Sequence, residues 1–171
     1  MVIDKSSDLL NYTYKEIVEY LLQKYGPAKY TYFRTNTCKS KNPKVSRTKE
    51  GLFCHHIDEN RAILLSEPEF AQKNPWAYQQ SDRLVYCNYL EHLILHAKIF
   101  EESENGSGEH HNEILGLGGV LLISEELYKI YSGYRVSGWR EYVATPILNK
   151  SDEFTKIVEY VKEIIKRKRC L

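Results

Sequence analysis

The six histidines of this chain occur as adjacent or closely spaced pairs, and one pair has the spacing of a metal site. His92 and His96 are four residues apart, so on a helix both imidazoles would lie on one face, one turn apart and close enough to bind one cation. Two histidines on an otherwise apolar helix face could equally be packed core residues. The adjacent pair His55-His56 favours the metal hypothesis, because three imidazoles can bind an ion while a fourth acts as a base.

The other two pairs each raise a structural question. Adjacent residues of a regular strand point to opposite faces, so His55 and His56 can both reach one site only at a strand end or a bulge. His110-His111 lies in a glutamate-rich stretch that contains Gly-Ser-Gly. A solvated loop is expected there rather than a second metal site.

The apolar pattern predicts the elements that must position these histidines. An amphipathic helix is expected over residues 14–25, where Thr13 opens a capping-box pattern and Gly26-Pro27 supplies the end. Asn88 predicts the start of a second helix, which continues at helical spacing to about residue 101. Short strands are expected near residues 30–33, over 51–57 and over 84–87.

The C-terminal part of the chain is expected to be helical. Ser124 is predicted to cap a short helix that ends near Gly133, and Ser151 to cap the last helix. Gly116-Leu-Gly-Gly119 is predicted to be a turn, because a phosphate-binding loop needs a fuller glycine pattern and a following Lys-Ser or Lys-Thr. The predicted apolar face of the last helix consists of Phe154, Ile157, Val158, Val161, Ile164 and Ile165.

Composition bounds the class of protein. The chain has 171 residues, of which 42% are hydrophobic and 27% charged, and these are ordinary values for a globular domain. A net charge of +1 argues against a histone-like polycation. No apolar run approaches the roughly 20 residues of a membrane span, and no signal peptide is visible, so a cytoplasmic protein is expected. The four cysteines include no Cys-x-x-Cys pair and are expected to be free thiols.

The near-neutral total hides local segregation of charge. From Lys29 to Lys49 there are seven basic residues and no acidic one, and a second basic segment begins at Lys162. Such blocks are typical of solvated loops and tails, but they could equally neutralise phosphates. The segment that leads into the His-His strand is the best candidate for phosphate contacts, which would position a substrate without reading its sequence. Its residues are Lys39, Lys41, Lys44, Arg47 and Lys49.

The histidine pattern resembles a known family of nucleases. The segment Cys54-His55-His56-Ile57-Asp58, followed by residues 83–96, is similar to the HNH, or ββα-metal (His-Me finger), endonucleases, most closely to the colicin-DNase variant with His-His and His-x-x-x-His. In that family a His-His pair ends the first strand, an Asn begins the second, and two helix histidines follow this Asn by nine and thirteen residues. His92 and His96 stand at those two distances from position 83. The resemblance covers about 45 residues.

The resemblance implies a fold and a mechanism. It implies a single α+β domain over residues 1–171, with a ββα-metal finger core at about 51–101, a two-stranded antiparallel ribbon plus a helix, flanked by helices at 8–26 and 151–168. His55, His92 and His96 would bind one divalent metal ion, Mg²⁺, Mn²⁺, Ni²⁺ or Zn²⁺, and His56 would be the general base that activates water. The implied activity is hydrolysis of DNA, with RNA as an alternative substrate, and a homodimer would suit a double-strand cut.

One position departs from the family pattern. Arg83 stands where the family has the Asn that braces the loop and orients the catalytic histidine, and an arginine cannot accept a hydrogen bond. Three alternatives follow: Asp82 orients His56 as a carboxylate partner, Arg83 contacts the scissile phosphate, or the protein binds nucleic acid with weak or no catalysis. Asn60 and Asn88 are other candidate braces, although Asn88 is better explained as a helix cap.

The segment between His56 and His92 is also longer than in compact members of the family. It carries Trp76 and Tyr78, which could touch a substrate but are expected to pack.

Overall fold

Helices make up most of the structure, and they surround one short β-ribbon. The structure is a computed structural model that describes residues 3–104 and 114–169. The loop predicted to hold His110-His111 therefore lies outside the described residues. The mixture of helices with an antiparallel ribbon agrees with the predicted α+β class. The elements are α1 (Tyr14–Tyr25), β1 (Phe53–His56), α2 (Pro68–Ala71), β2 (Leu84–Cys87), α3 (Tyr89–Glu102), α4 (Leu117–Tyr131), α5 (Trp139–Ala144) and α6 (Ser151–Arg169).

The ribbon and α3 form one connected unit. β1 and β2 pair antiparallel, and His56, the last residue of β1, lies opposite Leu84. Asn88 connects β2 to α3 as the N-cap: its side chain accepts a hydrogen bond from the N–H of Glu91, and the Glu91 carboxylate accepts one from the N–H of Asn88. The predicted second strand and the predicted cap are both confirmed. Asn88 is thus a helix cap, and strand, strand and helix follow one another in the order that the sequence predicts.

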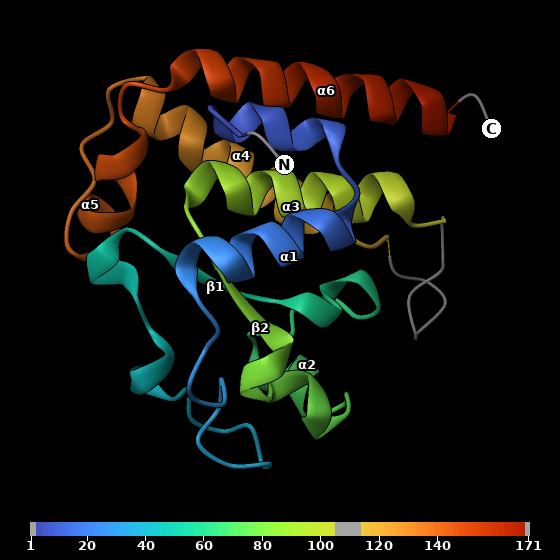
Figure 1. The fold of residues 1–171 in the computed structure, drawn as a ribbon, viewed down its shortest axis with the longest axis vertical. Coiled ribbons are helices and arrows are strands. Elements are labelled where there is room, and N and C mark those ends of the chain that lie inside the picture. The colour runs from blue at the N-terminus through green and yellow to red at the C-terminus, as the bar shows by residue number, and fades with distance from the viewer. Residues whose placement is uncertain (1–2, 105–113, 170–171) are drawn as a thin grey trace.

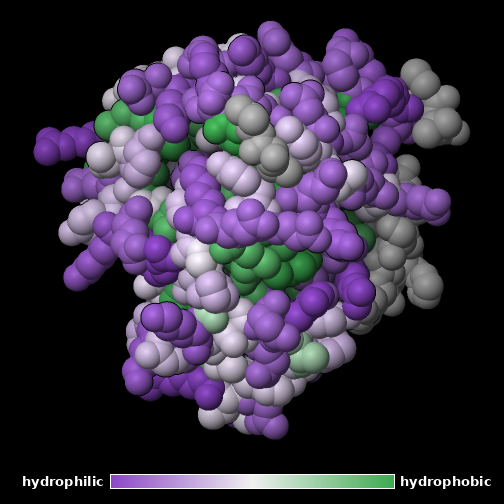
Figure 2. All heavy atoms as spheres, in the orientation of Figure 1, coloured by the Kyte–Doolittle hydropathy of each residue, from purple (hydrophilic) through white to green (hydrophobic). Residues whose placement is uncertain are grey.

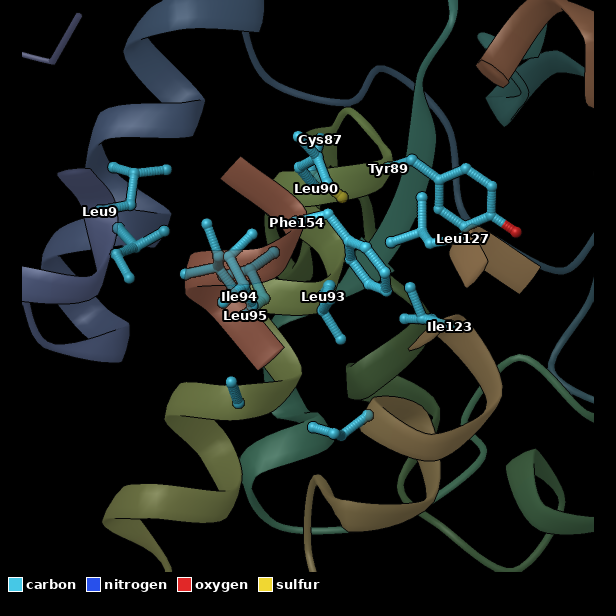
Figure 3. Close-up of a cluster of buried hydrophobic side chains, with 14 of the residues drawn as sticks. Leu9, Cys87, Tyr89, Leu90, Leu93, Ile94, Leu95, Ile123, Leu127 and Phe154 are labelled. Atoms are coloured by element: carbon cyan, nitrogen blue, oxygen red, sulfur yellow. The ribbon is translucent and has the colours of Figure 1, made fainter. Parts of the chain in front are cut away.

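α3 is buried on almost every side, which explains its nearly uninterrupted run of apolar residues. α1, α4, α6 and a 3-10 turn at Ser6–Asn11 all pack against it, and Figure 1 shows α3 between α6 and α1. Figure 3 shows Leu93 of α3 close to Ile123 and Leu127 of α4 and to Phe154 of α6. Fully burying one such aliphatic side chain contributes roughly 1.5–3 kcal/mol, so α3 is a rigid base for the histidines that it carries.

The two flanking helices follow the predicted patterns. The first helix is confirmed in its bounds, and Thr13 forms the predicted capping box with Glu16. The last helix begins at Ser151 itself, one residue earlier than a cap at that position would place it. Its predicted apolar face is confirmed, since Phe154, Ile157, Val161 and Ile164 are buried while Val158 and Ile165 pack against the core at its edge.

A polar network joins α3 to α6. Lys98 contacts Glu101 and Tyr160, and Arg167 lies 2.7 Å from Glu101. Partial burial raises the pKa of Glu101, but hydrogen bonds from Lys98, Tyr160 and Arg167 outweigh that effect and lower it to about 2. The carboxylate therefore stays charged in the folded protein and holds the end of α6 against α3.

Three local predictions were wrong, and one helix was missed. Ser124 does not cap a helix but lies inside α4, which begins directly after Gly116. The segment Gly116-Leu-Gly-Gly119 is therefore the start of a helix and not a simple turn. Its glycines are poor helix formers, so the sequence shows no sign of a helix there. Residues 30–33 form no named strand, because Phe33 makes only an isolated bridge to Lys41. α5 was not predicted, since six residues are too few for a visible helical period.

The surface seen in Figure 2 is mainly polar, with its largest apolar area in the middle of the view and smaller ones toward the upper left. Across residues 3–104 and 114–169, the helices all lack the combination of length and apolar character that a membrane span requires. Cys38 and Cys87 are buried free thiols and Cys54 is a partly buried one.

Candidate metal centre

Three imidazoles from two elements converge at the end of the ribbon. His55 comes from β1, and His92 and His96 come from successive turns of α3. One candidate ligand atom from each lies within 4.8 Å of the others, and the Nε2 atoms of His92 and His96 are 3.2 Å apart. At metal–nitrogen bonds of about 2.1 Å and tetrahedral or octahedral angles, neighbouring ligand nitrogens lie about 3.0–3.4 Å apart. The nitrogens of His92 and His96 already have this separation, and a pair at the 4.8 Å limit would have to approach by roughly 1.4–1.8 Å. The three residues that the sequence predicts as ligands are therefore brought together.

Tyr14 fixes the orientation and the tautomer of His55. The Tyr14 hydroxyl lies 2.8 Å from the carbonyl oxygen of Ile57 and 3.0 Å from Nε2 of His55. Because its single proton is donated to the carbonyl, the hydroxyl oxygen has to accept the Nε2–H of His55. The lone pair of His55 is then on Nδ1, a buried atom with no hydrogen-bond partner among the described residues. A metal ligand held by a hydrogen bond from its other ring nitrogen is the usual arrangement for histidine.

Burial keeps all three imidazoles in the form that binds metals. Desolvation lowers the pKa values of His55 and His92 well below 6.5, with further lowering from the neighbouring histidines, and it lowers that of His96 to about 4. Neutral imidazoles at neutral pH offer lone pairs to a cation without first losing a proton. Among the described residues, the Nδ1 atoms of His92 and His96 are also buried without hydrogen-bond partners, while their Nε2 atoms face each other. The unpaired Nδ1 of His55 beside these two facing nitrogens fits a site for a cation better than a packed apolar core.

Glu59 joins this cluster, and the sequence reasoning missed it. It lies in the 3-10 turn Ile57–Asn60 that follows β1, and its Oε2 is 3.3 Å from Nε2 of His96 and 3.6 Å from Nδ1 of His55. Burial raises the pKa of Glu59 to about 8. The turn brings Glu59 back beside the strand it has just left, which no helical or strand period in the sequence indicates.

Two glycines allow α4 to approach His96 closely. Gly116 has a φ of 78°, and a Cβ there would lie 2.4 Å from the carbonyl oxygen of His96. A Cβ on Gly119 would lie 2.2 Å from Nδ1 of His96. Any larger residue at either position would therefore overlap α3 or the imidazole itself. The glycines of the segment predicted as a turn thus shape the wall of the histidine cluster.

His56 lies beside the cluster but has its own partners. Its Nε2 is 2.9 Å from Oε1 of Gln79, whose amide nitrogen donates to the carbonyl oxygen of Leu65. The amide is thereby oriented so that His56 carries its proton on Nε2 and its lone pair on Nδ1. Tyr32 packs against the ring with centroids 4.4 Å apart. Burial lowers the pKa of His56 to about 4, against a smaller opposing effect of the Gln79 hydrogen bond.

The expectation that Asp82 orients His56 is wrong. Asp82 is exposed, and the side chain that forms a hydrogen bond with His56 is that of Gln79. Asn60 is exposed as well. A glutamine 23 residues away along the chain can only be identified as the partner from the tertiary structure, because nothing in its local sequence marks it.

Arg83 braces the turn after β1. Its guanidinium forms two hydrogen bonds with the fully buried carboxylate of Asp58, one of 2.7 Å from Nε and a shorter one from Nη2. This bidentate pair fixes the turn that carries Glu59. A contact of Arg83 with a phosphate stays a prediction, and in this structure the guanidinium forms this internal ion pair.

An open pocket gives access to both sets of histidines. It has a volume of about 580 Å³ and is lined by His55, His56, His92 and His96 together with Glu59 and Lys41. His55 and His56 therefore border one cavity because they stand at the end of the strand. Apolar side chains form the rest of its wall, including Phe53, Leu122 and Trp139.

The predicted basic segment divides into two kinds of residue. Lys39, Lys41, Lys44 and Lys49 are exposed, and Lys41 reaches the pocket. Arg47 instead pairs with Glu50 and donates a hydrogen bond to the carbonyl oxygen of Tyr25, so it serves the structure. Trp76 and Tyr78 pack against separate small apolar clusters, as expected.

Comparison with known proteins gave no match: no family model, no curated protein and no solved structure matches this chain. The chemistry of the site therefore has to be argued from its own residues.

Proposed function

We propose that this protein is a metal-dependent endonuclease of the ββα-metal type that hydrolyses phosphodiester bonds in DNA. The observation that carries the proposal is the convergence of His55, His92 and His96 from β1 and α3, with His56 next to them in the same pocket. Three neutral imidazoles suit one divalent ion, and a fourth, held separately by Gln79, suits a base.

Three of the histidines would bind the metal ion, and the fourth would act as the base. His55, His92 and His96 would hold the ion, which when bound supplies positive charge to a phosphoryl oxygen and to the departing oxygen. His56 would take a proton from the attacking water at Nδ1, because Gln79 keeps the other ring nitrogen protonated. Its pKa of about 4 means that it is neutral, and so able to accept a proton, over the whole physiological range.

Charge and aromatic side chains around the pocket support a nucleic-acid substrate. Lys41 lines the pocket, and a second pocket of about 370 Å³ shares Lys41 and Trp139 with it. Lys39, Lys44 and Lys49 are exposed on the same segment. Lysines can bind phosphates without reading sequence, and an exposed tryptophan can stack on a base. Trp139 lines the pocket of the histidines, whereas Trp76 packs against a separate apolar cluster.

A cleavage assay tests the proposal. Supercoiled plasmid incubated with the protein and Mg²⁺, Mn²⁺, Ni²⁺ or Zn²⁺ should be nicked or linearised with at least one ion, and EDTA should stop the reaction. His56→Ala should slow cleavage by about 100-fold or more while keeping one-to-one metal binding by calorimetry, whereas His92→Ala should lose both. Unchanged cleavage by His56→Ala would refute the assigned mechanism. Single-stranded DNA and RNA tested in parallel decide between substrates.

A second candidate function is binding of metal and nucleic acid without catalysis. The observation that favours it is the ion pair of Arg83 with Asp58, since Arg83 stands at the position where the resembling nucleases have an Asn. This candidate predicts salt-dependent DNA binding with no cleavage under any ion. If the site has decayed, Arg83→Asn should raise cleavage; if Arg83 braces the active loop, Arg83→Asn should lower it.

A further inference from the structure

Glu59 is the acidic side chain of the histidine cluster, and the proposed function gives it no role. The 3-10 turn after β1 places its carboxylate between imidazoles from two different elements, with the same oxygen 3.3 Å from Nε2 of His96 and 3.6 Å from Nδ1 of His55. These two nitrogens are the ones that face the cluster, because Nε2 of His55 is occupied by Tyr14.

Among the described residues, the buried carboxyl group of Glu59 has no Lys or Arg as an ion-pair partner. The Glu59 side chain is only 13% exposed, and among the described residues its ion-pair contacts are to these two histidines. Burying a carboxylate without a cation is unfavourable. A divalent ion among the imidazoles would supply the missing positive charge at the position that the carboxylate oxygen already faces.

We infer that Glu59 is the fourth protein ligand of the metal, giving a donor set of three imidazoles and one carboxylate. This inference rests on the proposed function, which needs only the three histidines. The turn that carries Glu59 is fixed by the ion pair of Arg83 with Asp58, so the fourth ligand is held in place before any ion arrives.

Three imidazoles and one carboxylate favour some divalent ions over others. Imidazole nitrogens select borderline transition metals over Mg²⁺ or Ca²⁺, which prefer oxygen ligands. Four protein donors fill the coordination of a tetrahedral Zn²⁺, whereas a six-coordinate Mn²⁺, Co²⁺ or Ni²⁺ keeps two positions for water and a phosphate oxygen. We therefore expect hydrolysis to be supported by six-coordinate transition ions and suppressed by Zn²⁺.

Metal binding by Glu59→Gln is the direct test, since glutamine has almost the same shape but is a much weaker ligand. Calorimetry with Co²⁺ and Ni²⁺ should show affinity lowered by about 30-fold or more, and the visible spectrum of bound Co²⁺ should change because a ligand has been lost. Glu67→Gln is the matched control: it removes one charge from an exposed glutamate, paired with Lys41, and should leave affinity and spectrum unchanged.

The possible outcomes separate the two proposals. Wild-type affinity and spectrum in Glu59→Gln would overturn the role of Glu59 and leave the three-histidine site standing. Failure of the wild-type protein to bind any transition ion would overturn the proposed function as well. Thermal unfolding without metal verifies that the variant folds, and Glu59→Ala is the substitute if it does not, with the same loss of affinity expected.

Discussion

Gly119 offers a sharp test of how α4 shapes the histidine cluster. An added Cβ would lie 2.2 Å from Nδ1, 2.4 Å from Cε1 and 2.5 Å from Cγ of His96. His96 is 8% exposed, and its ring also faces His92 and Glu59. Gly119→Ala should therefore force the ring of His96 away from the position in which its nitrogen can bind a metal.

The neighbouring glycine provides a matched control. A Cβ on Gly118 would meet no described atom within 4 Å, and both glycines lie in the first turn of α4. In each variant the change to alanine should favour the helix by roughly 0.5–1 kcal/mol. Only Gly119→Ala adds overpacking, which typically costs about 1–3 kcal/mol. The difference between the two variants isolates the contact with His96.

Calorimetric titration with Ni²⁺ and thermal unfolding are the measurements. Gly119→Ala should bind the ion at least about 100-fold more weakly, which corresponds to about 2.7 kcal/mol. Without metal, this variant should also unfold at a lower temperature than Gly118→Ala. Gly118→Ala should keep the wild-type affinity. Equal affinities in the two variants would show that α4 does not hold His96, and the assigned packing of the site would be wrong.

Three further predictions concern the support of the site and of the fold. Tyr14→Phe removes the hydroxyl that sets the tautomer of His55 and should weaken Ni²⁺ binding about 10-fold by calorimetry; unchanged affinity would contradict the tautomer. Asp58→Asn leaves Arg83 without its charged partner and should lower the free energy of unfolding in urea by about 1–3 kcal/mol, so a loss well under that range would argue against a brace. Glu101 has a pKa of about 2 when folded and 4.5 ordinarily, so its contribution is complete above pH 4.5 and is lost as the pH falls toward 2. Allowing for solvent screening, wild type should lose about 1–2 kcal/mol more than Glu101→Gln over that interval in urea titrations, and parallel losses would refute the role of the network.

The elements that carry the site could be predicted because their signals are local. The capping boxes at Thr13 and Asn88 involve groups three residues apart, and the four-residue spacing of His92 and His96 already places both on one helix face. The same locality explains why the predicted cap at Ser124 is wrong. Serine is a good capping residue, but the helix begins earlier, at Leu117, in a glycine-rich segment where close packing against α3 requires glycine.

What the tertiary structure alone decided is which groups surround the histidines. Tyr14 reaches His55 across 41 residues, Gln79 reaches His56 across 23, and Gly119 meets His96 from another helix. These partners come from segments whose own patterns serve other purposes, such as a buried helix face or a polar loop. For each histidine, burial and contacts between distant segments determine the tautomer, the pKa and the direction in which the lone pair points. The residue types therefore specify the possible chemistry, and the packing of the chain selects among those possibilities.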